Sequence, residues 1–181
     1  MRALATAVDG VVLIEPKVFG DERGFFFESW NRRAFAEAVG RDVEFVQDNH
    51  SHTARGILRG LHYQTKQPQG KLVRVVSGEV YDVAVDLRRS SPTFGRWVGE
   101  RLSAANRRML WIPAGCAHGF LVLSESADFL YKATDYYAPG HEQVLLWSDP
   151  ALAIAWPLDG EPRLNARDAA GTPLERAETY P

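Results

Sequence analysis

The sequence has little cysteine, no long apolar run and no excess of charge of one sign. Its one cysteine, Cys116, excludes an internal disulfide and any metal site built from several cysteines. No uncharged run approaches the roughly 20 residues needed to cross a bilayer, and the first residues reach Asp9 too early for the apolar part of a signal peptide. A net charge of -2 gives no electrostatic reason to expect a nucleic acid or an anionic membrane as partner. We therefore expect a cytoplasmic protein.

The length and composition are typical of one compact domain. The chain has 181 residues, of which 45% are hydrophobic and 24% charged, so disorder and fibrous repeats are poor interpretations. We expect a single domain over residues 1–181.

Glycine and proline are spread through the chain and separate short runs rich in β-branched and aromatic residues. Such runs, divided by turns and with few helical stretches between them, predict a mainly β protein, an antiparallel sandwich or barrel. The expected strands are residues 11–14, 24–30, 43–49, 72–76, 79–87, 96–102, 108–112, 119–123 and 128–134.

Few helices are expected. Residues 31–40 predict one, with Asn31 as its N-cap, Gly40 as its C-cap and an apolar stripe that includes Phe35. A second helical turn is expected near residues 165–170, and the polar tail 171–181 is expected to be loosely held.

Several polar residues fall where a strand would bury them. If residues 55–64 form a strand, alternation places Arg59 and His62 on opposite faces, and the two glycines of this segment predict a close approach by a ligand or another backbone. Taken singly, His62, His118, Lys71 and Tyr131 are each more typical of structural residues than of catalytic ones.

The combination of motifs is more specific. The pattern Pro-x-Gly-x-x-His at 113–118 resembles a motif of the cupin superfamily, which consists of small jelly-roll barrels. Together with residues 23–26, 55–64, 70–75, 82–88, 90–95, 110–113 and 131–137, in this order, the chain closely resembles the dTDP-4-dehydrorhamnose 3,5-epimerase family over residues 5–172. The resemblance implies a cupin-type jelly-roll β-barrel with a few short helices.

The resemblance also implies a substrate and a chemistry. The family acts on a dTDP-linked 4-keto-6-deoxyhexose, most commonly on the route to dTDP-L-rhamnose, and the C4 ketone acidifies the hydrogens at C3 and C5. Epimerisation then needs a base, an acid on the opposite face and a group that stabilises an enolate, but neither a metal nor a redox cofactor. By resemblance His62 is the base oriented by Asp168, Tyr131 is the acid, Lys71 stabilises the enolate and His118 contacts the sugar.

Nucleotide recognition is likewise implied by the family. Arg23 and Arg59 match arginines that hold the pyrophosphate, a task that suits a guanidinium fork. Further positions that match the family's substrate contacts are Glu28, Gln47, Asp48, Asn49, Glu142 and Arg167, the last commonly a lysine in the family. Because N-terminal strands of one subunit often complete the neighbour's site in this family, a homodimer with two-fold symmetry is expected.

Three other functions are compatible with parts of the sequence. A metal-dependent cupin gathers two or three histidines and a carboxylate, whereas this chain has one histidine in each motif region, and His50 and His52 are expected in a loop. A related epimerase acting at C3 or C5 alone would differ in the sugar pocket, around Tyr131. A non-catalytic sugar-nucleotide-binding cupin would not need an acid opposite a base. We favour the double epimerase, and expect Cys116 to be a small apolar filler.

Overall fold

The computed structural model describes residues 1–181 and contains thirteen β-strands, two short α-helices and two 3-10 turns. The elements are β1 (Arg2–Ala5), β2 (Val12–Glu15), β3 (Phe19–Asp21), β4 (Gly24–Phe26), α1 (Arg32–Val39), β5 (Gln47–Ala54), β6 (Leu58–Gln64), β7 (Lys71–Ser77), β8 (Glu79–Asp86), β9 (Trp97–Ser103), β10 (Met109–Ile112), β11 (Cys116–Val122), β12 (Ser126–Ala133), η1 (Pro139–His141), β13 (Glu142–Val144), α2 (Ala166–Ala169) and η2 (Leu174–Arg176). No helix is both long enough and apolar enough to span a membrane.

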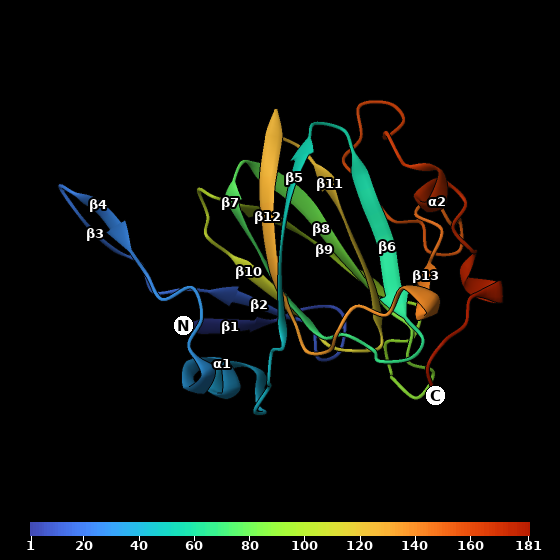
Figure 1. Ribbon diagram of the computed structural model, residues 1–181, viewed down its shortest axis with the longest axis horizontal. Coiled ribbons are helices and arrows are strands. Elements are labelled where there is room, and N and C mark those ends of the chain that lie inside the picture. The colour runs from blue at the N-terminus through green and yellow to red at the C-terminus, as the bar shows by residue number, and fades with distance from the viewer.

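Two antiparallel sheets face each other (Figure 1). The six-stranded sheet has the order β1-β2-β10-β7-β12-β5, and the five-stranded sheet has the order β13-β6-β11-β8-β9. The hairpin of β3 and β4 is separate from both sheets. The expected mainly β, jelly-roll class is confirmed, with the barrel built as two facing sheets rather than one closed ring of strands.

The main hydrophobic core lies between the two sheets. Val73, Val80 and Leu110 belong to it, together with Phe120 and Phe129, whose stacked ring centroids are 4.2 Å apart. Because successive strand residues point to opposite faces, alternate residues of β7, β8, β11 and β12 line this interior. The interior also receives the polar residues described below.

Helix α1 covers the outer face of the six-stranded sheet. The Asn31 side chain accepts a hydrogen bond from the Ala34 amide at 3.2 Å, and Gly40 ends the helix with φ 75°. Phe35 is buried edge-on against Trp111, with ring centroids 5.3 Å apart. The predicted helix is therefore confirmed together with both of its caps.

The C-terminal segment covers the outer face of the five-stranded sheet, and the expectation of a loosely held tail was wrong. The Tyr180 amide donates to the Leu87 carbonyl, and the Tyr180 carbonyl accepts from Arg89, both at 2.9 Å. Ala177 is buried in a cluster with Val83 and Val85. Without this cover, the apolar outer residues of β8 would face water, which explains why a polar tail is bound so closely.

Some expected strands differ from those observed. The strand expected over 24–30 ends at Phe26, and the one expected over 43–49 begins only at Gln47 and continues to Ala54, while β1, β3 and β13 were not predicted. His50 and His52 therefore lie on β5 and not in a loop. Their side chains approach the Asp128 carboxylate at 2.9 and 3.3 Å. Strand β5 is polar on both faces because it forms an edge of its sheet, so its sequence shows no apolar alternation.

Candidate active site

A β-bulge in β6 sets the position of His62. His62 lies opposite His118 on β11, while Arg59 lies opposite Phe120, so β6 has one residue more than β11 between these pairs. Directly opposed residues share a face, and Arg59 and His62 therefore both face the interior. The alternation that placed them on opposite faces was wrong because it assumed a regular strand.

Gly60 makes this bulge possible. A Cβ atom at Gly60 would lie 2.5 Å from the Gly119 Cα on the neighbouring strand, and Gly60 has φ 126°. Any side chain would collide with β11 and would also have to adopt a strained backbone conformation. The close approach of another backbone that the glycines predicted is thus confirmed at Gly60.

His62 forms a hydrogen-bonded pair with Asp168. Its Nε2 lies 2.7 Å from Asp168 Oδ1, and Asp168 Oδ2 accepts the Gly60 amide at 3.2 Å. Asn165 caps the short helix α2 by accepting from the Asp168 amide at 2.7 Å. Burial opposes ionisation of Asp168, but the bonds from His62 and Gly60 outweigh it and hold the pKa of the carboxyl below its usual value. The carboxylate fixes the His62 ring and leaves Nδ1 without a partner in the chain.

Lys71 is a cation without an ion-pair partner. It begins β7 and shares the interior face with Val73 and Val75. Burial lowers the pKa of Lys71 to about 8, although the negative charges of Glu142 and Asp82 act in the opposite direction. The side chain is still mainly an ammonium at neutral pH. An ammonium with no carboxylate bound to it is suited to stabilise an oxyanion that forms between the two sheets.

Tyr131 lies on the wall opposite His62. It belongs to β12 of the six-stranded sheet, pairs in register with Asn49 and Val73, and has Lys71 Nζ 5.9 Å from its ring centroid. Burial raises the pKa of Tyr131, with a further contribution from the negative charge of Glu142. The hydroxyl therefore keeps its proton at neutral pH and can act as a donor. His62 and Tyr131 approach the interior from two different sheets.

A second histidine–aspartate pair lies beside the first. His118, the register partner of His62, has its Nε2 at 2.9 and 3.1 Å from the two oxygens of Asp82 on β8. Both side chains are buried. Burial, with smaller contributions from Lys71 and His62, lowers the pKa of His118 against the effect of Asp82, so the ring is neutral at pH 7.

The rim of the site is a network of polar side chains. Arg167 and the Tyr137 hydroxyl both donate to Glu142 Oε2, the latter at 2.9 Å. Gln47 donates to Asn49 at 3.0 Å and accepts the Tyr137 amide at 3.0 Å. The structure thus brings four expected binding residues together. Tyr137 and Asp82 were not predicted from the sequence, because the position of Tyr137 depends on a loop and the contact of Asp82 depends on a neighbouring strand.

Arg59 belongs to the same interior. Its Nε donates to Thr53 Oγ1 on β5 at 3.0 Å, and its charge acts to lower the pKa of Tyr131, against the larger effect of burial. The guanidinium therefore reaches from the five-stranded sheet toward β5 of the six-stranded sheet.

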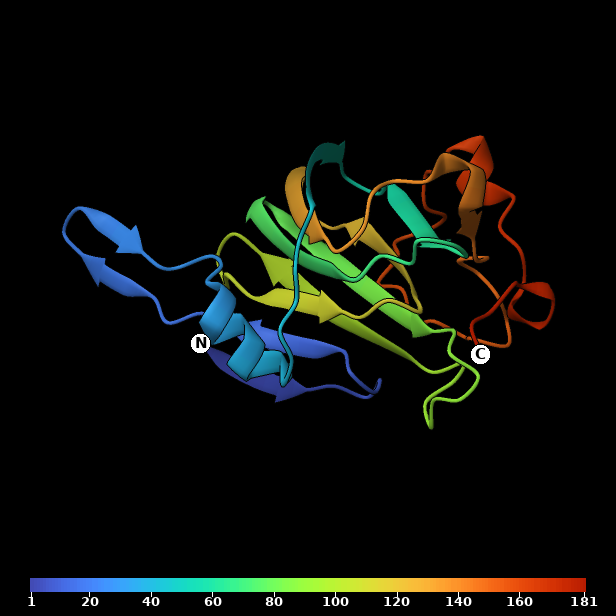
Figure 2. The ribbon, with the colours of Figure 1, turned by 60° about the horizontal axis from the view of Figure 1, so that its bottom comes forward.

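Three expected binding residues are not brought to this interior. Arg23 lies in the β3–β4 hairpin, which projects from the rest of the molecule in both views (Figures 1 and 2), and bonds to Asp21. Glu28 follows that hairpin and accepts a bond from Asn31 at 3.1 Å. Asp48 lies on the outer face of β5, where Lys132 donates to both of its oxygens at 3.0 Å.

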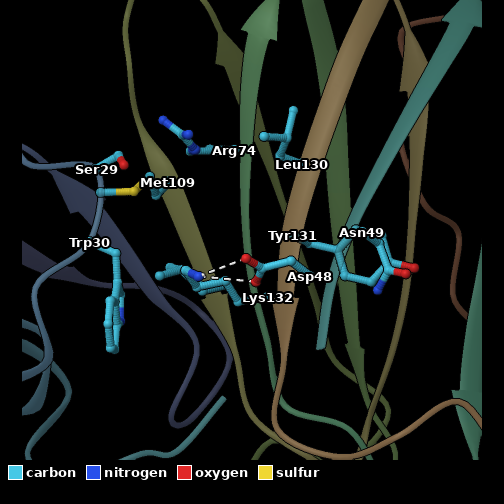
Figure 3. A pocket seen from close by; sticks show the side chains of 10 residues that line it. Ser29, Trp30, Asp48, Asn49, Arg74, Met109, Leu130, Tyr131 and Lys132 are labelled. Atoms are coloured by element: carbon cyan, nitrogen blue, oxygen red, sulfur yellow. Dashed lines mark hydrogen bonds and ion pairs between the residues drawn. The ribbon is translucent and has the colours of Figure 1, made fainter. Parts of the chain in front are cut away.

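A pocket on the outer face of the six-stranded sheet surrounds that Asp48–Lys132 pair (Figure 3). Trp30 and Arg74 also line it. Figure 3 places Asp48 and Lys132 on one side of β12 and the register pair of Tyr131 and Asn49 on the other. This pocket is therefore separated by the sheet from Lys71 and His62.

Comparisons with known proteins show the family to which the chain belongs. The sequence model of the dTDP-4-dehydrorhamnose 3,5-epimerase family matches residues 5–176. A dTDP-4-dehydrorhamnose 3,5-epimerase from Pseudomonas aeruginosa is 63% identical over 181 residues, which is 100% of both chains. The chain belongs to the dTDP-4-dehydrorhamnose 3,5-epimerase family. The resemblance inferred from the motifs is confirmed over nearly the same range.

Solved structures of other epimerases share the fold. The crystal structure of dTDP-6-deoxy-D-glucose-3,5-epimerase from Legionella pneumophila, in complex with dTDP-4-keto-L-rhamnose, has a TM-score of 0.94 and 53% identity, and covers 98% of this chain and 94% of that one. A 3'-monoepimerase from Streptomyces bikiniensis, in complex with dTDP-quinovose, has a TM-score of 0.88 and 36% identity, with 97% and 88% covered. The fold is thus shared by epimerases whose names give different specificities.

Proposed function

We propose that this chain epimerises C3 and C5 of dTDP-4-dehydro-6-deoxy-D-glucose to give dTDP-4-dehydro-L-rhamnose. The observation that carries the proposal is the placement of His62, which is paired with Asp168 of α2, on one sheet and of Tyr131 and Lys71 on the facing sheet. A base and an acid on opposite walls can invert a carbon that lies between them, and a mere binding protein does not need that arrangement.

Each inversion uses the residues in a fixed order. His62 Nδ1 takes the proton from the carbon next to the ketone, and the electron pair of the broken C–H bond moves onto the ketone oxygen as an enolate. The Lys71 ammonium stabilises the negative oxygen, because a cation beside a developing oxyanion lowers the energy of the enolate. Tyr131 then donates its hydroxyl proton to the opposite face of the same carbon, and the ketone re-forms.

Exchange with solvent restores the protonation states of His62 and Tyr131. After one inversion His62 holds an additional proton and Tyr131 has lost one, and exchange with water restores both before the second carbon reacts. Asp168 stays ionised throughout, because its role is to orient the ring and to stabilise the imidazolium that forms. No step in this scheme calls for a metal or a redox cofactor.

We further propose that Arg59, Gln47, Asn49, Glu142 and Arg167 contact the nucleotide diphosphate, and that Arg23 and Glu28 act on the site of a second subunit. Support for the second part comes from the hairpin, which projects from the rest of the molecule, whose Phe25 and Phe26 are 60% and 67% exposed and whose Arg23 side chain is 84% exposed. Exposed aromatics on a projecting arm are typical of a segment that a partner covers. Asp48 lies on the outer face of β5, so it too would contact substrate only at the site of a second subunit. We place this homodimer in the cytoplasm.

The activity is tested by incubating the protein with dTDP-4-dehydro-6-deoxy-D-glucose in D2O and following the sugar by proton NMR. The proposal expects both the C3 and the C5 proton signals to disappear as the L-sugar forms. Exchange at one carbon alone would replace it with a single-site epimerase, and binding without exchange would indicate a non-catalytic cupin.

The dimer is tested by mixing two inactive variants, Arg23→Ala and His62→Asn. If the hairpin acts in trans, each mixed dimer contains one site with both wild-type residues, so random exchange restores about a quarter of the wild-type sites. Absence of any recovery, with mixed dimers demonstrated by mass, would contradict completion of the site across the interface.

A further inference from the structure

Asp82 is a buried carboxylate with one partner. It lies on β8 with no exposed surface, and its neighbours on the same face, Val80 and Ala84, belong to the apolar core between the sheets. Both of its oxygens contact the same atom, His118 Nε2, at 2.9 and 3.1 Å. A carboxylate in apolar surroundings is costly unless its bonds compensate for lost hydration. Its placement therefore calls for an explanation in terms of His118.

The contact decides which nitrogen of His118 carries hydrogen. Both oxygens of the Asp82 carboxylate contact Nε2, and a carboxylate accepts hydrogen bonds, so Nε2 is the donor. His118 Nδ1 has no partner within the chain, and in the neutral ring it is a free acceptor. The ring is also held from the side by Phe129, which stacks with it at 6.0 Å and 24°.

The pair stands next to the proposed base. His118 and His62 are register partners on neighbouring strands, and each is bound through Nε2 to an aspartate. The order across the sheet is Asp82 on β8, His118 on β11 and His62 on β6, with Asp168 beyond. The Nδ1 atoms of these two neighbouring histidines thus both lack a partner within the chain.

We propose that Asp82 is a positioning residue that fixes His118 as the Nε2–H tautomer, so that His118 Nδ1 accepts a hydrogen bond from a ring hydroxyl of the sugar and holds the reacting carbon against His62. This inference rests on the proposed epimerase function and adds a role for a residue outside the catalytic set. In the simpler alternative the pair only stabilises the core. If that alternative holds, replacing Asp82 lowers the stability of the fold but does not lower turnover through an effect on His118.

The decisive variant is Asp82→Asn, which keeps the size of the side chain. An asparagine amide can donate to Nε2, and the hydrogen then moves to Nδ1, which removes the acceptor. We expect kcat to fall roughly 10- to 100-fold, the range for one lost hydrogen bond to a reacting substrate, while dTDP affinity changes less than about twofold.

A matched control is Asp149→Asn. Asp149 is likewise buried, but its oxygens accept the backbone amides of Ala151 and Leu174 outside the site. We expect it to lower the unfolding temperature and to leave kcat within about twofold of wild type. An equal loss of kcat in both variants would overturn the proposal.

A double-mutant cycle with His118→Ala tests the route of the effect. If Asp82 acts through His118, then Asp82→Asn costs little further turnover once His118 is replaced, whereas independent action multiplies the two losses. Multiplying losses would overturn the proposal.

The tautomer is measured on the wild-type protein by 15N NMR of labelled histidine, which does not depend on how any variant folds. A His118 ring with its proton on Nδ1 would overturn the proposal. Deuterium exchange by the wild type, measured in parallel, distinguishes failure of the epimerase function from failure of the proposed role of Asp82. Absence of exchange there contradicts the epimerase function, while exchange that Asp82→Asn leaves unchanged contradicts only the role of Asp82.

Discussion

Two histidine–aspartate contacts in this chain have similar lengths and very different surroundings. His62 lies 2.7 Å from Asp168 in the interior, and His50 lies 2.9 Å from Asp128 on the outer face of the other sheet. The side chains of the first pair are 28% and 1% exposed, and those of the second are 58% and 26% exposed. Distance alone does not separate the two contacts; burial and the remaining partners do.

The difference lies in what holds each carboxylate. Asp168 is fixed by the Gly60 amide and by its place in α2, so it can orient one ring. Asp128 is shared between His50 and His52 and competes with water, and such exposed contacts contribute little. A fixed tautomer, which a general base requires, follows only from the interior pair.

The two lysines of neighbouring strands repeat this contrast. Lys132 on the outer face donates to Asp48, whereas Lys71 in the interior has no ion-pair partner and has a pKa lowered to about 8 by burial. An ammonium that is already paired with a carboxylate stabilises a developing oxyanion less than an unpaired ammonium does. The interior face therefore combines a fixed base with an unpaired lysine, whereas on the outer face His50 is exposed and Lys132 is already paired with a carboxylate.

The largest effect is expected from His62→Asn, compared with His50→Asn. Loss of the general base should lower kcat by roughly 10³-fold, while dTDP affinity changes little. His50→Asn should leave kcat within about twofold, since an exposed contact is all that it removes. Steady-state kinetics measure kcat and calorimetry measures dTDP affinity. Equal losses of kcat in the two variants would show that the interior and outer histidines do not differ in function.

The next effect is expected from Asp168→Asn, compared with Asp128→Asn. The interior substitution leaves His62 without the carboxylate that fixes its ring and stabilises its protonated form, and kcat should fall on the order of 10²-fold. The outer substitution should have almost no effect on kcat. If Asp168→Asn retained full turnover, the orienting role of the interior carboxylate would have to be abandoned.

A smaller effect is expected on the alkaline side of the pH profile. With a pKa of about 8, Lys71 is an ammonium below that pH and an uncharged amine above it, so kcat/KM should fall about tenfold per pH unit above pH 8. Arginine stays charged over this pH range, so Lys71→Arg should be slower than wild type but should not show the fall of kcat/KM above pH 8. Persistence of the limb in Lys71→Arg would assign it to another group.

The smallest effect is expected from Cys116→Ala. Cys116 is 5% exposed, and burial raises the pKa of its thiol to about 12. It shares the interior with His118 but has neither a charge nor a polar partner, so the variant should lose about 1 kcal/mol of unfolding free energy and less than half of kcat. Rapid modification of the native thiol at pH 7, with loss of activity, would show that this interpretation of Cys116 is wrong.

The sequence predicts some of these features better than others. Helix α1 was predictable with its boundaries, because Asn31 and Gly40 satisfy the two ends locally. The faces of Arg59 and His62 were not predictable by alternation, since the bulge at Gly60 depends on contact with Gly119 of another strand. The position of the C-terminal segment was not predictable from its own residues, because the apolar surface that it covers belongs to β8.

The candidate site shows the same limit. Individually, His62, Lys71 and Tyr131 were indistinguishable from structural residues, and only the ordered set of motifs indicated a shared chemistry. Asp82 lay within one of the quoted motifs, yet its role depends on His118 some 36 positions away in the chain, which strand pairing alone brings into contact.

The most direct test of the account is deuterium incorporation by Tyr131→Phe in D2O. If His62 and Tyr131 act from opposite walls, the variant still removes a proton through His62 but cannot deliver one to the other face. We predict that the substrate is recovered with deuterium at C3 or C5 and with its configuration unchanged. Inverted product at the wild-type rate would show that the acid is a group other than Tyr131.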